Sequence, residues 1–98
     1  MTHITSTTLR DRGPKGATIW LEGLERHGWR GGETYSVTIT PEAIIYTKAT
    51  EGKTRKVTAS NGGLIDTTNK KVQVWAQGAT EVQVHIGSQR IHIERVVA

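Results

Sequence analysis

Basic side chains are the groups in this sequence that point most directly to a chemistry. They occur in small groups along the chain, and such groups contact the phosphates of a nucleic acid backbone. The candidates are Arg10, Arg12, Lys15, Arg26, Arg30, Lys53, Arg55, Lys56, Lys70 and Lys71. We predict that these residues contact duplex DNA. The alternative is that they are solvated side chains that protect the edges of a sheet.

The overall charge agrees with an anionic partner. The chain has 13 Lys and Arg residues against 9 Asp and Glu residues, which gives a formal net charge of +4. Its sequence pI is about 9.8. A positive charge of this size favours association with nucleic acid. It also fits a protein that is basic for no functional reason, and composition alone leaves both interpretations open.

Two histidines in the last third suggest a metal site. If residues 87–90 form a hairpin turn, His85 lies opposite His92, and two such neighbours are able to share a zinc ion. The sequence fixes no third ligand beside them, and Glu94 follows the same face only weakly. We therefore predict no metal and no cofactor.

Catalytic patterns are weak. The chain has no cysteine, its two aspartates (Asp11 and Asp66) pair with no glutamate at a telling spacing, and its glycines form no phosphate-binding motif. Its serines have no nucleophile-elbow context. We predict that the protein is not an enzyme. A histidine-dependent ribonuclease remains an alternative, since His and Lys suffice for that reaction.

Three tryptophans are candidates for stacking on bases. In a small protein without phenylalanine, tryptophan more often fills the core. We expect this for two of the three, with Trp29 the clearest. The exposure of Trp75 does not follow from the pattern.

The size and composition indicate one small domain with a thin core. The chain has 98 residues, of which 35% are hydrophobic. Such a core favours a homodimer or two halves that complete each other. No apolar run is long enough for a membrane helix, and the first residues lack the apolar stretch of a secretory signal. We therefore expect a cytoplasmic protein with no membrane partner.

The first half predicts a strand, a short helix and a hairpin. Residues 1–12 are polar and non-periodic, so we expect a flexible arm that precedes a single β-rich domain at 13–98. Residues 17–21 predict a strand, and residues 22–28 predict at most two helical turns that end at Gly28. Tyr35, Val37 and Ile39 alternate with polar residues, and residues 43–49 predict the return strand.

The last third predicts a three-stranded meander over 64–98. Apolar residues alternate in residues 72–76, 82–86 and 91–93. A shift of 47 residues also aligns the two hairpins, with Tyr35 on Val82 and Ile44 on Ile91. A duplicated half and a chance similarity of two hairpins both explain this. The fold class we expect is mostly β with one short helix, as a small β-barrel.

Residues 19–46 (IWLEGLERHGWRGGETYSVTITPEAIIY) resemble the AbrB/MazE/SymE group of swapped-hairpin DNA-binding proteins. The shared pattern is a strand, a short helix that ends in Gly28 and Trp29, an alternating strand, an acidic turn and an Ile-Ile return strand. The resemblance implies a dimer of interleaved hairpins that contacts DNA from its N-terminal edge. The sequence departs from the pattern at Trp20 and His27, and its hairpin at 71–95 extends beyond a minimal member of the group.

The resulting hypothesis is a homodimeric DNA-binding protein that acts as a transcriptional regulator or as a nucleoid-associated or antitoxin-like factor. Two alternatives remain. One is a structural or inhibitory protein-interaction module, for example one encoded by a phage. The other is a SymE-like toxin that acts on RNA. Neither the biological role nor the DNA sequence follows from the residues.

Overall fold

Short strands are the predominant elements of the chain. The structure is a computed structural model, and it describes residues 2–96. In chain order, the elements over these residues are β1 His3–Thr8, β2 Arg10–Asp11, the 3-10 helix η1 Gly13–Lys15, β3 Ala17–Leu21, the 3-10 helix η2 Leu24–His27, β4 Thr34–Ile39, β5 Ala43–Lys48, β6 Arg55–Lys56, the 3-10 helix η3 Ser60–Gly62, β7 Ile65–Asn69, α1 Lys70–Ala76, β8 Glu81–Ile86 and β9 Arg90–Arg95. The prediction of a mostly β chain is confirmed.

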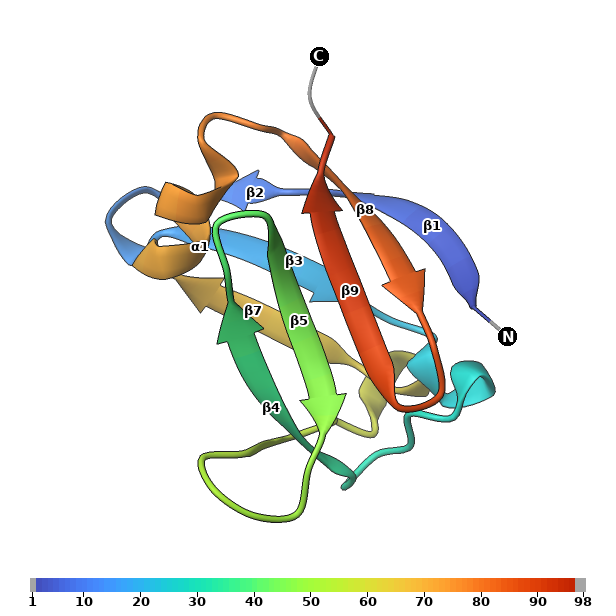
Figure 1. Cartoon of the computed structure of the whole chain (residues 1–98). Helices are drawn as coiled ribbons and strands as arrows, with labels where there is room; N and C mark the ends of the chain where they lie inside the picture. Colours follow the sequence, from blue (N-terminus) through green and yellow to red (C-terminus); the bar gives the residue numbers. More distant parts are fainter. Residues whose placement is uncertain (1, 97–98) are drawn as a thin grey trace.

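The strands form two sheets, and the chain passes between them several times (Figure 1). The larger sheet has the order β1-β8-β9-β5-β4-β6, and the smaller has the order β2-β3-β7. β1 leads through Leu9 into β2, so these two strands join the sheets. Within residues 2–96, no strand pairing connects β4 with β7. The sheets therefore stay open, and the prediction of a closed barrel is wrong.

The two predicted hairpins are confirmed. In β4–β5, Val37 lies opposite Tyr46, and in β8–β9, Val84 lies opposite Ile93. Alternation places one side chain in two on the core side. Tyr46, Val84 and Ile93 are fully buried, whereas Thr38 between Val37 and Ile39 is exposed.

The short helix expected at 22–28 is a 3-10 turn, η2. It ends where we predicted, because Gly28 has a φ of 94° and its N–H bonds back to Glu25 and Leu24. That positive φ favours glycine. Trp29 follows and is fully buried, as expected.

The strand expected at 72–76 is wrong, because this segment is the α-helix α1. Asn69 caps the helix, since its side chain accepts a hydrogen bond from the Val72 N–H at 2.8 Å. Val72, Trp75 and Ala76 are buried, whereas Val74 is 75% exposed. Buried residues at this spacing lie on one face of a helix. The same segment also has apolar residues at every second position, which is the pattern of a strand. The last third is therefore β7, α1, β8 and β9 rather than a meander of three strands.

The flexible arm expected at 1–12 is also wrong for the residues that form strands. β1 pairs with β8 over its whole length, and β2 pairs with β3. The side chain of Thr7 donates to the carbonyl of Trp20 at 3.5 Å. The sequence pattern is silent here because the pairing uses backbone groups, and Ile4, the apolar residue in β1, is 56% exposed. Met1 and residues 97–98 of the expected arm and domain lie outside the described residues.

The two halves of the chain repeat the same arrangement. The first half runs β3-η2-β4-β5 and the second runs β7-α1-β8-β9. A shift of 47 residues places the bounds of β4–β5 on those of β8–β9. β3 pairs antiparallel with β7, and β5 pairs antiparallel with β9. Equivalent strands therefore pair with each other, as around a two-fold axis, and the later hairpin completes the core of residues 19–46.

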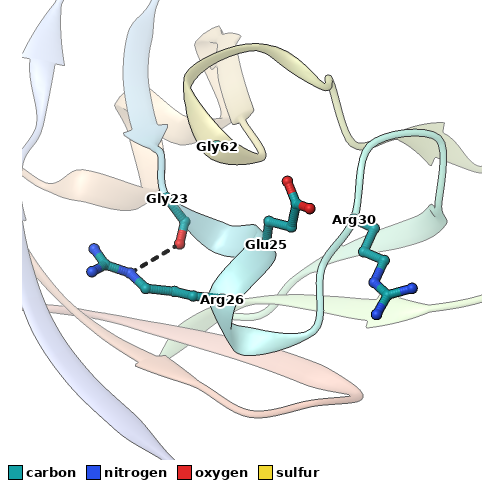
Figure 2. A pocket seen from close by; sticks show the side chains of 5 residues that line it. All are labelled: Gly23, Glu25, Arg26, Arg30 and Gly62. Atoms are coloured by element: carbon teal, nitrogen blue, oxygen red, sulfur yellow. Dashed lines mark hydrogen bonds between the residues drawn. The ribbon is translucent and has the colours of Figure 1, made fainter.

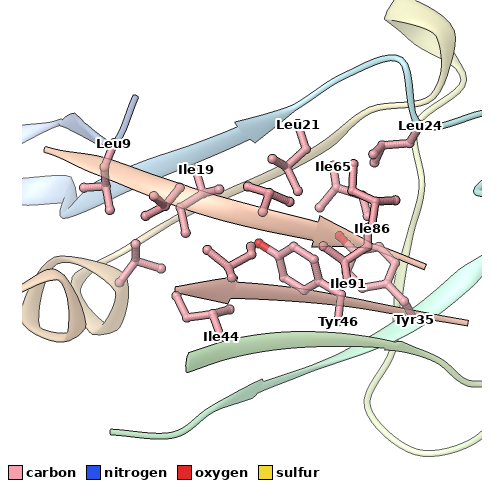
Figure 3. Packing of buried hydrophobic residues seen from close by; sticks show 14 of the residues in the cluster. Leu9, Ile19, Leu21, Leu24, Tyr35, Ile44, Tyr46, Ile65, Ile86 and Ile91 are labelled. Atoms are coloured by element: carbon pink, nitrogen blue, oxygen red, sulfur yellow. The ribbon is translucent and has the colours of Figure 1, made fainter. Parts of the chain in front are cut away.

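The core lies between the two sheets (Figure 3). Ile19 and Ile65 from the small sheet face Ile91 and Tyr46 from the large one, and all four are at most 1% exposed. The Tyr46 hydroxyl and the Thr67 Oγ1 form a buried hydrogen bond of 2.6 Å between the sheets. Burial raises the pKa of Tyr46, so this hydroxyl stays protonated.

Candidate nucleic-acid interface

A groove lies beside β4, where the two sheets remain unjoined. Its volume is about 960 Å³. Four of the predicted basic residues line it, namely Lys53, Arg55, Lys70 and Lys71. They come from β6 and the turn before it on one side and from α1 on the other. The fold thus brings together two groups that are far apart in the sequence.

The amphipathic character of α1 exposes its two lysines. The helix buries Val72, Trp75 and Ala76 against the rest of the protein. Lys70 and Lys71 lie in the first turn, and both are exposed. Both side chains line the groove. The buried face of α1 fixes how the helix is rotated about its axis, and this places the two lysines on the side of the groove.

The N-terminal basic group lies beside the start of α1. A Cβ placed on Gly16 would lie 2.1 Å from the backbone carbonyl carbon of Asn69, so the chain after η1 is in direct contact with the first turn of the helix. The Gln73 side chain of α1 also donates to Asp11 at 3.4 Å. Lys15 immediately precedes Gly16, and Arg12 immediately follows Asp11. These two basic residues are thus chain neighbours of residues that contact α1, but neither lines the groove, and the Arg12 Nε donates to the Thr18 hydroxyl of β3 at 3.2 Å.

The predicted contact residues are available to a partner. All ten are exposed. The two ion pairs found within residues 2–96 join Lys48 to Glu33 and His92 to Glu94, and neither involves any of the ten. Unpaired surface cations contact phosphates without first breaking an internal pair.

None of the other four predicted residues lines the groove. Arg26 and Arg30 lie at the other end of β3 and line a different pocket of about 600 Å³ with Glu25. Figure 2 shows the Arg26 side chain turned back to the Gly23 carbonyl, to which its Nε donates at 3.3 Å, while Arg30 extends away from it. Two further predicted residues do not line the groove either: Arg10 lies in β2, and Lys56 lies next to Arg55 in β6.

Sequence reasoning missed Arg95. Its guanidinium donates to the carbonyls of Trp75 and Pro41 at 2.8 and 3.0 Å, and it lies 4.9 Å from the centre of the Trp75 ring. It thereby connects α1 to the turn between β4 and β5. Neither partner was predictable, because both contacts are to backbone carbonyls of distant residues.

Lys48 is another basic residue that the sequence did not single out. Its Nζ lies 2.8 Å from Glu33 and 5.2 Å from the centre of the Trp29 ring. The hydrogen bond from Lys48 lowers the pKa of Glu33. Lys48 is therefore a structural cation, in contrast to the unpaired residues of the groove.

The tryptophans divide as expected. Trp29 and Trp75 are buried, and Trp20 is 36% exposed. The Trp29 Nε1 donates to the Gly87 carbonyl at 2.7 Å. The Nε1 of Trp75, which lines the groove, is buried without a hydrogen-bond partner among residues 2–96. An unpaired buried donor is rare, which marks Trp75 as an unusual part of the groove wall.

The predicted pairing of the two histidines is confirmed. His85 lies opposite His92 with their ring centres 5.9 Å apart, on the outer face of the large sheet. His85 shares a hydrogen bond with Gln83, and His92 is paired with Glu94 at 3.0 Å. Over residues 2–96, no three His, Cys, Asp or Glu side chains are grouped to hold a metal ion.

Neither a membrane-spanning helix nor a match to a known protein is found for the described residues. None of the helices within residues 2–96 has the length and apolar character needed to cross a membrane. Protein-family models, curated proteins and solved structures give no match to this chain. The resemblance of residues 19–46 to the AbrB/MazE/SymE group therefore stays a prediction.

Proposed function

We propose that this protein binds duplex DNA through the phosphate backbone, with α1 and its neighbours as the contact surface. The contact residues would be Arg12, Lys15, Lys53, Arg55, Lys70 and Lys71. One observation supports the proposal most: two basic groups that are separated in sequence line one groove, and none of their members is in an ion pair within residues 2–96. The third group lies next in the chain to Gly16, which contacts the start of α1.

Backbone binding fits the chemistry of this surface better than base recognition does. Phosphate contacts need exposed cations at suitable spacing. Base recognition needs an element that enters a groove of the duplex, and α1 has seven residues with two lysines in its first turn. The protein therefore acts as a general DNA-binding factor in the cytoplasm, with regulatory, nucleoid-associated or antitoxin-like roles all compatible with this mode.

A second copy is not needed to complete the core, because β5–β9 and β3–β7 already pair the two halves of one chain. The resemblance implies a homodimer, and that expectation stays a prediction. On the proposal, one chain presents one contact surface.

The test is a titration of a labelled duplex by fluorescence anisotropy at two salt concentrations. If about six phosphates are contacted, affinity falls by about 10³-fold between about 50 and 200 mM salt. The variant with Lys70→Glu and Lys71→Glu is expected to bind at least tenfold more weakly and with a smaller salt slope.

The matched control is the variant with Arg26→Glu and Arg30→Glu. It carries the same change of charge at the other end of β3, away from the proposed surface. Equal losses in the two variants would show that net charge alone drives binding. Absence of binding at low salt would reject the proposal.

A further inference from the structure

The outer edges of the two hairpins differ in how far they are paired. In the second half, β1 pairs with β8 along all of Glu81–Ile86. In the first half, β4 holds the equivalent position, but β6 pairs with it at two residues, Thr34 and Tyr35. Among residues 2–96, no strand pairs with the rest of that edge of β4.

Val37 and Ile39 carry the backbone groups at this open edge. The Thr40 N–H donates to the Ala43 carbonyl at 2.8 Å, so Thr40 directs its backbone toward β5. Residues of an antiparallel strand alternate between their two neighbours. The N–H and C=O groups of Val37 and Ile39 therefore point away from β5, toward the side without a strand.

The side chains differ between the halves in the same way. Val84 and Ile86, which are the counterparts of Val37 and Ile39, are 0% and 5% exposed beside β1. Val37 and Ile39 are partly buried, and both line the groove. The groove is thus the place in the first half that a strand equivalent to β1 would fill.

The surroundings of this edge select the charge of an incoming segment. Lys53 and Arg55 lie on one side and Lys70 and Lys71 on the other, and none of the residues that line the groove is acidic. Val74 adds an apolar side chain that is 75% exposed. The edge therefore combines unpaired backbone groups, an apolar floor and positive charge on both sides.

We propose that the groove binds an acidic, extended peptide segment of a partner protein, which adds to β4 as an antiparallel strand. Its backbone pairs with Val37 and Ile39, as β1 pairs with β8. Its apolar side chains cover Val37 and Ile39, and its carboxylates contact the four flanking cations. Strand addition of this kind takes its affinity from backbone hydrogen bonds and its specificity from alternate side chains.

A nucleic acid fits these observations less well. Phosphates contact the cations, but a nucleic acid backbone has no alternating N–H and C=O groups to pair with Val37 and Ile39. The peptide proposal goes beyond DNA binding and stands without it. Because both ligands use Lys70 and Lys71, an acidic peptide bound here displaces DNA.

The test uses a labelled synthetic peptide of alternating valine and glutamate, with a valine and lysine peptide as its control. Fluorescence anisotropy measures binding, and amide hydrogen exchange of the unaltered protein reports the edge. We expect the acidic peptide to bind, and to slow exchange at the Val37 and Ile39 amides at least tenfold. The basic peptide should do neither.

Two variants at one position separate strand addition from charge attraction. Val37→Pro removes the N–H that faces the open edge, where proline is tolerated. Val37→Thr keeps that N–H and the branched shape. We expect Val37→Pro to weaken peptide binding at least tenfold and Val37→Thr to change it less than threefold.

Several results would overturn the proposal. They are no peptide binding at low salt, binding without slower exchange at Val37 and Ile39, and equal binding by the two peptides. A single-stranded oligonucleotide that protects these amides as well as the peptide does would assign the groove to nucleic acid instead. The exchange measurement decides the question even if Val37→Pro does not fold.

Discussion

Ile45 lies directly opposite His92 in the pairing of β5 with β9, and His92 is the residue 47 positions later in the chain. A residue that pairs with its own counterpart marks a local two-fold axis. The pairing of β3 with β7 agrees. Ile19 lies opposite Thr67, which is the counterpart of Trp20, and Trp20 lies opposite Asp66, which is the counterpart of Ile19. The two halves are therefore related by an approximate two-fold axis within one chain.

Gly16 and Gly63 are 47 residues apart, and we expect both to be sensitive to a methyl group. Gly16 has a φ of 106° and Gly63 a φ of 95°. An added Cβ would lie 2.1 Å from the Asn69 backbone in one case and 2.8 Å from the Glu25 nitrogen in the other. Each Gly→Ala variant should lose about 2–3 kcal/mol of stability, at the upper end of the ordinary range for substitutions.

The control for these variants is Gly32→Ala. Gly32 has a φ of 91°, but no atom lies within 4 Å of an added Cβ. It therefore reports the backbone strain alone, about 1 kcal/mol. Urea denaturation measures all three variants, and equal losses would contradict the close approach of the two halves.

The buried hydrogen bond between Tyr46 and Thr67 should appear as a coupling energy. Tyr46→Phe leaves the Thr67 hydroxyl unpaired in the core, and Thr67→Val does the same to Tyr46. We expect each to lose about 1–3 kcal/mol. The double variant should lose clearly less than both losses combined, as a double-mutant cycle from urea denaturation would show. Additive losses would mean that the two hydroxyls do not interact.

The Asn69 side chain that caps α1 should contribute to the stability of the protein. Asn69→Ala removes the side chain that accepts from the Val72 N–H, and we expect a loss of about 1 kcal/mol. Asn69→Ser keeps a capping oxygen and should retain most of the stability. Thermal and urea unfolding of the two variants measure the difference, and equal stability would argue against the cap.

Glu33 should make stability depend on pH in a defined direction. Its pKa is lowered from 4.5, first by the hydrogen bond from Lys48. A carboxylate whose pKa is lower in the folded state stabilises the fold above its unfolded pKa. That contribution is lost as the pH falls through the folded pKa. It is small, because the Glu33 side chain is 35% exposed.

The measurement compares Glu33→Gln with the unaltered protein by urea denaturation at several pH values. The stability difference should be present at neutral pH and vanish in strong acid. Glu42→Gln, at an exposed site in the turn between β4 and β5, is the control for the loss of one surface carboxylate. A difference that persists in acid would rule out the ion pair as its cause.

The sequence predicts the elements in which burial alternates and misses those that depend on distant partners. Val82, Val84 and Ile86 alternate because one face of β8 is buried, so the hairpins were predictable. In α1, the apolar residues Val72, Val74 and Ala76 also occupy every second position, so the segment was predicted as a strand. The buried residues Val72, Trp75 and Ala76 have helical spacing instead. The capping residue Asn69 was the local signal that could have distinguished the two.

The sequence identifies the basic residues of the candidate site but not where in the fold they meet. The basic character of Lys53, Arg55, Lys70 and Lys71 is visible in the sequence. Their meeting at one groove depends on how α1 packs against β3 and β7, across the groove from β4, and that packing is set by the buried side chains of the helix. The open edge at Val37 and Ile39 was equally hidden, because it arises from the shortness of β6.

The place of β1 has a consequence for how the chain folds. His3 pairs with Ile86, so β1 finds its partner strand only after the residues between them have been made. Pairings between such distant residues slow folding, because a long loop must close before they form. During synthesis on a ribosome, β1 therefore waits unpaired until the C-terminal hairpin emerges. In that interval it is an exposed strand, open to association with other chains.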